Sequence, residues 1–197
     1  TKAIAVAGKV SSQNNGLTIE GATECLLIFS AATDLNWPTV EKRGADPLPV
    51  VQKAVNAASK MSWSVLKNKH IADFQSFYNR NIIQLTAKQN TSVEKLATAE
   101  RLVRFSKGVS DVTSPILYFN FGRYLLISSS RPGGLPANLQ GLWAEEYQTP
   151  WNGDYHLNIN LQMNYWPAES TNLADCHKPL VQFTQQLVKP GEKTAQA

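Results

Sequence analysis

The first thirty residues alternate short apolar runs with turn residues, a pattern typical of β-strands. An Asn15-Gly16 pair predicts a hairpin turn between the first two of three apolar runs, which lie at Ala3–Val10, Leu17–Ile19 and Cys25–Phe29. An isolated hairpin is only marginally stable in water, so these strands need more sheet than the chain supplies. We therefore expect this part to be the end of a larger β domain.

After a loop rich in proline and glycine at 36–49, the apolar residues recur at steps of three and four, which predicts helices. The first two helices are predicted at Val50–Ser59 and Ser64–Leu85, with His70 packed and hydrogen-bonded on the apolar side of the second. The polar stretch Ala87–Thr98 is predicted to be a loop that contains a Thr91-x-x-Glu94 capping box.

A third helix is predicted at Pro115–Ser129, where Ser114 is suited to the N-cap and proline to the first helical position. Its residues are apolar nearly all round, so we expect it to be buried between neighbours. Further helices are predicted at Asn160–Tyr165, before Pro167, and at Leu173–Val188, closed by Pro190-Gly191. Loops and helices alternate without a βαβ pattern or an internal repeat, which indicates α/α hairpins.

The composition excludes several classes of protein. With 43% apolar and 17% charged residues, the 197-residue chain can bury a core. The net charge of +4 comes from scattered Lys and Arg residues, so we expect no nucleic acid partner. No window approaches the roughly 20 apolar residues that cross a bilayer, and no signal peptide is evident at the N-terminus. Cys25 and Cys176 lie far apart without a CxxC spacing, so neither a metal motif nor a disulfide framework is expected.

The connection from Ser130 to Asn158 is far longer than the usual roughly four to six residues, and long ordered loops usually carry function. From Ser128 to Trp166 the chain combines amides, aromatic rings and turn residues more densely than core packing requires. Flat apolar faces and amide groups suit a polyol, so this segment predicts a sugar site. The densest part holds these residues: Trp151, Asp154, Tyr155, His156, Asn158, Asn160, Gln162, Asn164, Tyr165 and Trp166.

Asn158 and Asn160 are two residues apart, which in an extended or turn segment places both amides on one face while Ile159 points into the core. A neutral amide takes a proton from water only if a carboxylate is hydrogen-bonded to its far side. Without that carboxylate, the pair only donates and accepts hydrogen bonds to sugar hydroxyls. Asparagines in loops also cap helices and satisfy backbone groups, and this alternative stays open for each of them.

The carboxylates of this region do not form an evident catalytic pair. A glycosidase needs two carboxyl groups, roughly 6.5–9.5 Å apart for inversion or about 5–5.5 Å for retention. We expect Glu145 and Glu146 to be a solvated loop face, and Asp154 to form an Asx-turn after Gly153. No His or Asp cluster has metal-ligand spacing, so we expect neither a metal nor a cofactor.

The sequence resembles glycoside hydrolase family 95, the α-L-fucosidases that act mainly on terminal α-1,2-linked fucose. Two runs carry the resemblance: FGRYLLISSSRPGGLPANLQGLW and W-x-G-x-x-HLNINLQMNYWPAE-x-x-NL-x-x-C, with weaker likeness in HIADFQSFYNR and TAERLVRF. The resemblance implies a mostly α chain with a short N-terminal β portion. Residues 1–45 would end a β-sandwich, 46–110 would form a helical linker, and 111–197 would be the first helices of an α/α toroid.

The resemblance also implies an inverting mechanism in which two asparagines activate water, matching Asn158 and Asn160. An Asp late in the toroid would charge them, and a Glu from its middle would be the general acid. Neither has a matching position here, so the chain alone should be inactive. His156 would contact the sugar near the fucose C5 methyl, and we assign Trp151, Asn164 and Trp166 to substrate binding.

The predicted parent protein is therefore an exo-acting α-L-fucosidase, with a fucosylated oligosaccharide or glycan and the remainder of its own chain as partners. Family habit suggests a secreted or periplasmic protein. Two alternatives stay open from the residues alone. One is a carbohydrate-binding domain that uses the Trp and Asn cluster without cleaving the sugar, and the other is a helical interaction domain in which these residues are structural.

Overall fold

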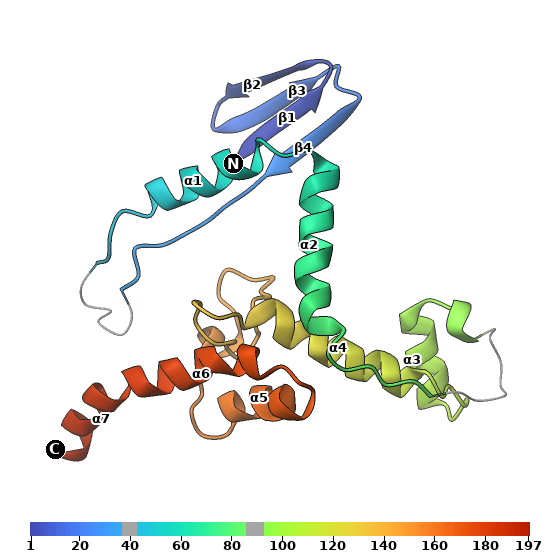
Figure 1. Cartoon of the computed structure of the whole chain (residues 1–197), viewed down its shortest axis with the longest axis vertical. Coiled ribbons are helices and arrows are strands. Elements are labelled where there is room, and N and C mark those ends of the chain that lie inside the picture. Colours follow the sequence, from blue (N-terminus) through green and yellow to red (C-terminus); the bar gives the residue numbers. More distant parts are fainter. Residues whose placement is uncertain (37–42, 86–92) are drawn as a thin grey trace. The chain divides into compact units, whose positions relative to one another are not determined.

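The computed structural model describes residues 1–36, 43–85 and 93–197 (Figure 1). It contains helices and short antiparallel strands, which confirms the predicted mixture of a β portion and a mostly α remainder. The chain forms two compact units, Thr1–Asp73 and Phe74–Ala197. The predicted capping box starts at Thr91 and so falls partly outside the described residues. The bounds of the three predicted domains stay predictions.

Four strands form the β portion of the first unit. Strand β1 (Lys2–Val6) pairs antiparallel with β4 (Glu24–Ile28), and β2 (Lys9–Gln13) pairs with β3 (Gly16–Glu20). The predicted first strand is split, because Ala7 and Gly8 adopt positive φ angles of 57° and 69°.

The hairpin turn lies one residue earlier than predicted. Gly16 already pairs with Gln13, so the turn consists of Asn14 and Asn15, with φ angles of 49° and 62°. A two-residue turn with both φ angles positive matches the right-handed twist of the strands it joins. Asparagine tolerates this conformation, so the predicted glycine is not needed there.

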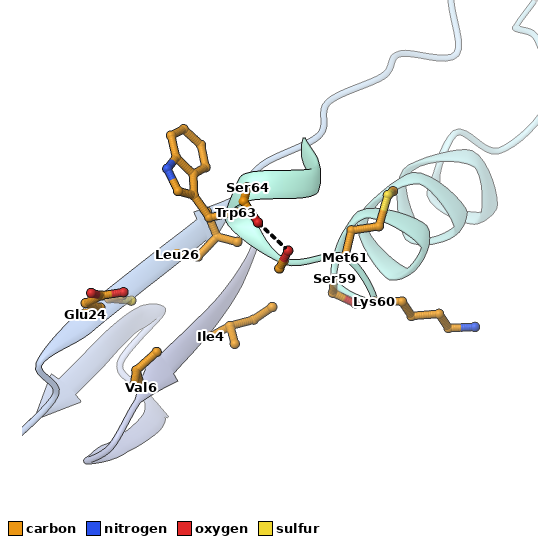
Figure 2. Close-up of a pocket in the computed structure, with 11 residues that line it drawn as sticks. Ile4, Val6, Glu24, Leu26, Ser59, Lys60, Met61, Trp63 and Ser64 are labelled. Atoms are coloured by element: carbon orange, nitrogen blue, oxygen red, sulfur yellow. Dashed lines mark hydrogen bonds between the residues drawn. The ribbon is translucent and has the colours of Figure 1, made fainter. Parts of the chain in front are cut away.

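The first unit also holds helix α1 (Leu48–Ala58) and most of α2 (Trp63–Tyr78), which ends in the second unit. A pocket of about 1050 Å³ lies between β1, β4 and the residues that join α1 to α2 (Figure 2). Ile4, Leu26 and Trp63 are among its lining residues, and none of the predicted site residues is. His70 is exposed rather than packed as predicted, and no other residue of α2 is buried.

Helix α2 ends at Tyr78 rather than at Leu85. Arg123 holds the chain where this helix ends, because its guanidinium donates to the carbonyl oxygen of Phe77 at 3.2 Å and to that of Asn81, beyond the helix, at 2.9 Å. Only 2% of Arg123 is exposed, and burial lowers its pKa. The last carbonyls of a helix have no partner within the helix, so a buried guanidinium is a strong substitute.

The second unit is helical: η1 (Val93–Lys95), α3 (Thr98–Ser106), α4 (Ser114–Ser129), η2 (Pro150–Gly153), α5 (Asn160–Ser170), α6 (Ala174–Gln186) and α7 (Val188–Ala195). Helix α5 contacts both α4 and α6, and their facing residues form the core. The most deeply buried side chains include Ile127, Leu161, Ala168, Leu173 and Cys176.

Two predicted helix ends are wrong. Helix α5 continues through Pro167 to Ser170, and its last turn is closed by Thr171, whose backbone N–H and hydroxyl both donate to the carbonyl of Pro167. Pro190 does not end a helix either, because it lies in the first turn of α7, where a backbone N–H has no acceptor within the helix.

Helix α4 differs from its prediction at its start and on its surface. Ser114 lies within the helix, and the carboxylate of Asp111 accepts the N–H groups of Thr113 and Ser114 in its place. The helix is not buried all round, since Tyr118 is 79% exposed. Within the described residues, α3 and α5 cover α4 only in part, and an apolar groove of about 630 Å³ lined by Leu102, Phe105, Leu117 and Phe121 lies between α3 and α4.

Asp111 also pairs with the buried Arg101, whose guanidinium nitrogens lie 2.8 and 3.0 Å from its two carboxylate oxygens. The hydrogen bond from Arg101 lowers the pKa of Asp111 to about 2. In the unfolded chain the carboxyl titrates near its ordinary pKa of about 3.9. The stability that Asp111 contributes is therefore complete above pH about 4 and is lost as the pH falls through about 2.

We expect Asp111→Asn to lower the free energy of unfolding by about 3 kcal/mol at pH 7, because it leaves the charge of Arg101 buried and unpaired. Urea unfolding of native protein and variant between pH 7 and 2 measures this difference. It should shrink as the pH falls below 4. A difference that stayed constant down to pH 2 would contradict the assignment.

Candidate active site

The hydroxyl of Tyr165 joins four segments of the second unit. It accepts the N–H of Ala137 at 2.7 Å and lies 2.8 Å from the hydroxyl of Ser130. Because Ser130 donates its single proton to the carbonyl of Cys176 at 2.7 Å, Tyr165 must donate to Ser130. The side chain is 3% exposed, and burial raises its pKa. These bonds connect α5 to the end of α4, to the following loop and to α6.

The long loop after α4 folds back on itself and onto α5. The backbone N–H of Leu139 donates to the carbonyl of Asp154 at 3.3 Å, and the amide of Gln140 donates to that of Pro150 at 3.0 Å. The hydroxyl of Tyr155 donates to the carbonyl of Pro136 at 3.0 Å, and burial raises the pKa of Tyr155. The loop is thus ordered by its own polar groups, as expected of a functional loop.

Asn164, which we assigned to substrate binding, helps to hold this loop. Its amide donates to the carbonyl of Asn138 at 3.1 Å, and the residue is half-buried. The geometry therefore gives Asn164 a structural contact on α5, one turn after Asn160. Its predicted contact with substrate stays a prediction.

The segment from His156 to Gln162, which we call the asparagine turn, contains both candidate catalytic amides. The N–H of Leu161 donates to the carbonyl of His156 at 3.0 Å, and the side-chain amide of Gln162 donates to that of Leu157 at 2.6 Å. Asn158 lies inside this closed turn, and Asn160 is the first residue of α5. The sequence allowed either a turn or an extended segment at Asn158 and Asn160, and the structure has a turn.

Ile159 does not point into a core, as its position between the two asparagines predicted. It is 50% exposed and has a φ of 78° and a ψ of −37°. Alternation of inward and outward side chains belongs to extended strands. It fails here because the chain reverses direction before α5 begins.

The side chains of Asn158 and Asn160 are exposed, and neither has a hydrogen-bond partner among residues 1–36, 43–85 and 93–197. Helix α5 has no side-chain cap. The alternative in which these asparagines cap a helix therefore finds no support, and both amides are available to a ligand.

The other residues that were predicted to contact substrate lie in or beside this turn in the sequence. The imidazole Nε2 of His156 lies 4.0 Å from the carboxylate of Asp154, and Trp151 is largely exposed with a positive φ of 50°. Trp166 is also largely exposed, on the surface of α5. In the described part of the chain no ring contact joins the two indoles, so the structure does not bring them together into one aromatic platform.

No pair of carboxylates is arranged for acid and base catalysis in this segment. Glu145 and Glu146 are exposed, as predicted, and Glu169 is hydrogen-bonded to His177 at 2.8 Å. The predicted Asx-turn at Asp154 is not formed, because the only side-chain contact of Asp154 within the described ranges is with His156. Those ranges contain no group of three potential metal ligands and no helix long and apolar enough to cross a membrane.

Sequence reasoning placed Tyr165 and Gln162 in the polar cluster but gave neither a role. A buried tyrosine needs a partner for its hydroxyl, and this requirement could have indicated a structural function for Tyr165. No comparable signal exists for Gln162, because its contact with Leu157 forms only when the turn closes.

Exposed amides and indoles on an ordered loop and on helix α5 after it suit the binding of a polyol. Comparison of the sequence with protein families specifies the class. The glycosyl hydrolase family 95 catalytic domain matches residues 62–197, and the chain belongs to this family.

Relatives with curated names extend the similarity over most of the chain. It is 38% identical over 194 residues to "Alpha-L-fucosidase 2" of Arabidopsis thaliana, covering 96% of this chain and 23% of the relative. It is 40% identical over 185 residues to "Probable alpha-fucosidase A" of Aspergillus niger, covering 90% and 23%. The Aspergillus oryzae protein of the same name is 36% identical over 168 residues, covering 85% and 22%. The chain thus spans less than a quarter of the length of these relatives.

We expect Tyr165→Phe to lower the free energy of unfolding by about 1–3 kcal/mol, because it leaves the N–H of Ala137 and the hydroxyl of Ser130 with unmet hydrogen bonds in a buried site. Urea unfolding measures the effect. Tyr118→Phe, which removes a hydroxyl from an exposed ring, is the matched control and should be neutral. Equal effects of the two changes would show that the Tyr165 hydroxyl has no special role.

Proposed function

We propose that the protein to which this segment belongs is an exo-acting, inverting α-L-fucosidase that hydrolyses terminal α-1,2-linked fucose from oligosaccharides or glycans. Family membership and the names of the relatives support the activity. The observation that carries the assignment of the site is the pair of exposed, unpartnered amides in the asparagine turn. In this proposal the segment supplies the side of the site that activates water.

The position of Asn160 suits this chemistry. A helix N-terminus carries a partial positive charge, and α5 begins at Asn160 without a side chain that neutralises its first N–H groups. The amide oxygen takes the proton from water while the amide N–H passes its own proton to a carboxylate, which leaves the neutral imidic acid. The water that loses its proton gains partial negative charge, and the positive end of α5 favours this charge. A carboxylate from elsewhere in the protein would hold the far side of the amide, and a carboxylic acid across the glycosidic bond would protonate the leaving oxygen.

The same proposal assigns the architecture. Strands β1 to β4 would be the last strands of a β-sandwich ending near residue 45, followed by a helical linker at 46–110. Helices α4 to α7 would belong to the first hairpins of an α/α toroid starting near residue 111. Helices α5 and α6 pack against each other, which supports a helical hairpin in this region. Strands β2 and β3 pair antiparallel, which supports the assignment of the strands to a β domain.

A carbohydrate-binding domain that does not cleave its ligand is less well supported. Residues 62–197 match a catalytic domain, and a role limited to binding does not require two amides at the positive end of a helix.

We expect Asn160→Asp or Asn160→Gly in the whole protein to lower kcat on 2′-fucosyllactose at least about 100-fold, the usual contribution of a general base. Measurement of fucose release gives kcat and KM. Asn68→Asp makes the same chemical change at an exposed position of α2 and should leave turnover unaltered. If Asn160 variants turned over at the native rate, Asn160 would have no part in the reaction.

His156 offers a test of sugar specificity. We propose that its half-buried ring packs near the C5 methyl of fucose, and that a smaller side chain leaves room for the hydroxymethyl group of L-galactose. His156→Thr should therefore shift the ratio of kcat/KM for fucosides over L-galactosides toward L-galactose by about 10-fold or more, since a group of this size in a pocket is worth about 1–3 kcal/mol. An unchanged ratio would rule out contact between His156 and this position.

A further inference from the structure

The backbone of Ile159 is unusual in this chain. Its φ of 78° and ψ of −37° lie in a region that side chains branched at Cβ rarely adopt. The other non-glycine residues with positive φ in the described ranges are asparagine, alanine or tryptophan, so Ile159 is the β-branched exception. This conformation occurs at the single residue between the two candidate catalytic amides.

Burial of the Ile159 side chain does not account for the strain, because half of the residue is exposed. Hydrogen bonds on both sides hold the conformation instead. The N–H of Met163 donates to the carbonyl of Ile159 at 2.9 Å, and the bond from Leu161 to His156 spans it. Leu161 is itself anchored in the core at 2% exposure.

Gln162 closes the turn from the helix side. Its amide donates to the carbonyl of Leu157 at 2.6 Å, directly before Asn158. Gln162 is exposed, so its side chain is not held there by packing. This exposed amide bonds to a backbone carbonyl rather than to water. It therefore fixes the peptide group that joins Leu157 to Asn158.

We propose that Gln162 is a positioning residue: its bond to the carbonyl of Leu157 helps to hold the strained backbone of Ile159, and so keeps the amides of Asn158 and Asn160 in one mutual geometry. This inference rests on the proposed function. A glycine or an asparagine at 159 would adopt the same φ with less strain, so the turn would then depend less on the bond from Gln162. Strained backbone at functional sites persists only where the surroundings enforce it, and misplacement of a reacting group by about 1 Å lowers the rate on the order of 100-fold.

Relief of the strain gives the first test, made in the whole protein with 2′-fucosyllactose. Gln162→Met should lower kcat about 10- to 100-fold with KM within about twofold of native. Ile159→Gly and Ile159→Asn both adopt a positive φ with little strain, so each should keep native kcat and should offset the loss when combined with Gln162→Met. The melting temperature should stay level or rise in both. Ile159→Val keeps the branched side chain and should retain native kcat. Double variants as impaired as Gln162→Met alone, or a kcat that falls only together with the melting temperature, would overturn the proposal.

A second test at Gln162 uses pH to remove and restore the donor of the positioning hydrogen bond. Gln162→Glu lacks a donor while ionised and regains one as the carboxyl protonates, near pH 4.3 in ordinary surroundings. Its kcat relative to native protein at the same pH should be low at pH 7 and recover as the pH falls toward 4.

Gln162→Met has no donor at any pH and should stay equally impaired, whereas Gln182→Glu on the exposed surface of α6 should match native protein throughout. Equal, pH-independent ratios for Gln162→Glu and Gln162→Met, or native rates in both, would overturn the role of Gln162. A native protein without fucosidase activity would instead refute the proposed function, together with the inference that rests on it. Active native protein with unaffected Gln162 variants would refute the positioning alone.

Discussion

The structure of the second unit depends on the buried hydroxyl of Tyr165. A phenol removed from water needs partners for its hydrogen bonds, and this one finds them in Ala137, Ser130 and, through Ser130, Cys176. Each partner lies on a different segment, so the ring fixes the end of α4, the start of the long loop and the first turn of α6 around α5. The loop that carries the candidate site can therefore be irregular and still be ordered.

A firmly held α5 also explains how the asparagine turn keeps a strained residue. Leu161 is buried in the same core as Tyr165, one turn apart on the helix, so the first turn of α5 cannot shift to relax Ile159. The result is a pair of exposed amides without a hydrogen-bond partner in the part of the chain that the structure describes. Side chains in that state suit ligand binding, because no hydrogen bond must be broken before a ligand forms its own.

Regular elements could be predicted from the sequence wherever the local pattern determines them. The β portion, α1 and the extent of α4 follow from apolar spacing and turn residues, but the split of the first strand at Ala7 and Gly8 does not. The early end of α2 could not be predicted, because Arg123 reaches it from more than forty residues away, and the cap of α4 comes from Asp111 rather than the adjacent serine. These contacts are decided by tertiary packing, which spacing does not encode.

The site, too, could be predicted from the sequence only in part. The density of amides and indoles predicted a site in this segment, and the resemblance to the family predicted Asn158 and Asn160 as the reacting pair. The turn that presents the pair could not be foreseen, because an Asn-Ile-Asn sequence equally suits a strand with an inward isoleucine. The positive φ of Ile159 and the bond from Gln162 arise only when the loop closes on α5.

The central claim is that neutral amides, activated from their far side, deliver water to the anomeric carbon in one step. The anomeric form of the first product tests it most directly, by proton NMR of fucose released from 2′-fucosyllactose by the whole protein. Direct attack by water inverts the centre, so β-L-fucose should appear first and convert to the α form only by slow mutarotation. Initial release of α-L-fucose would require a covalent intermediate on a carboxylate and would contradict the account.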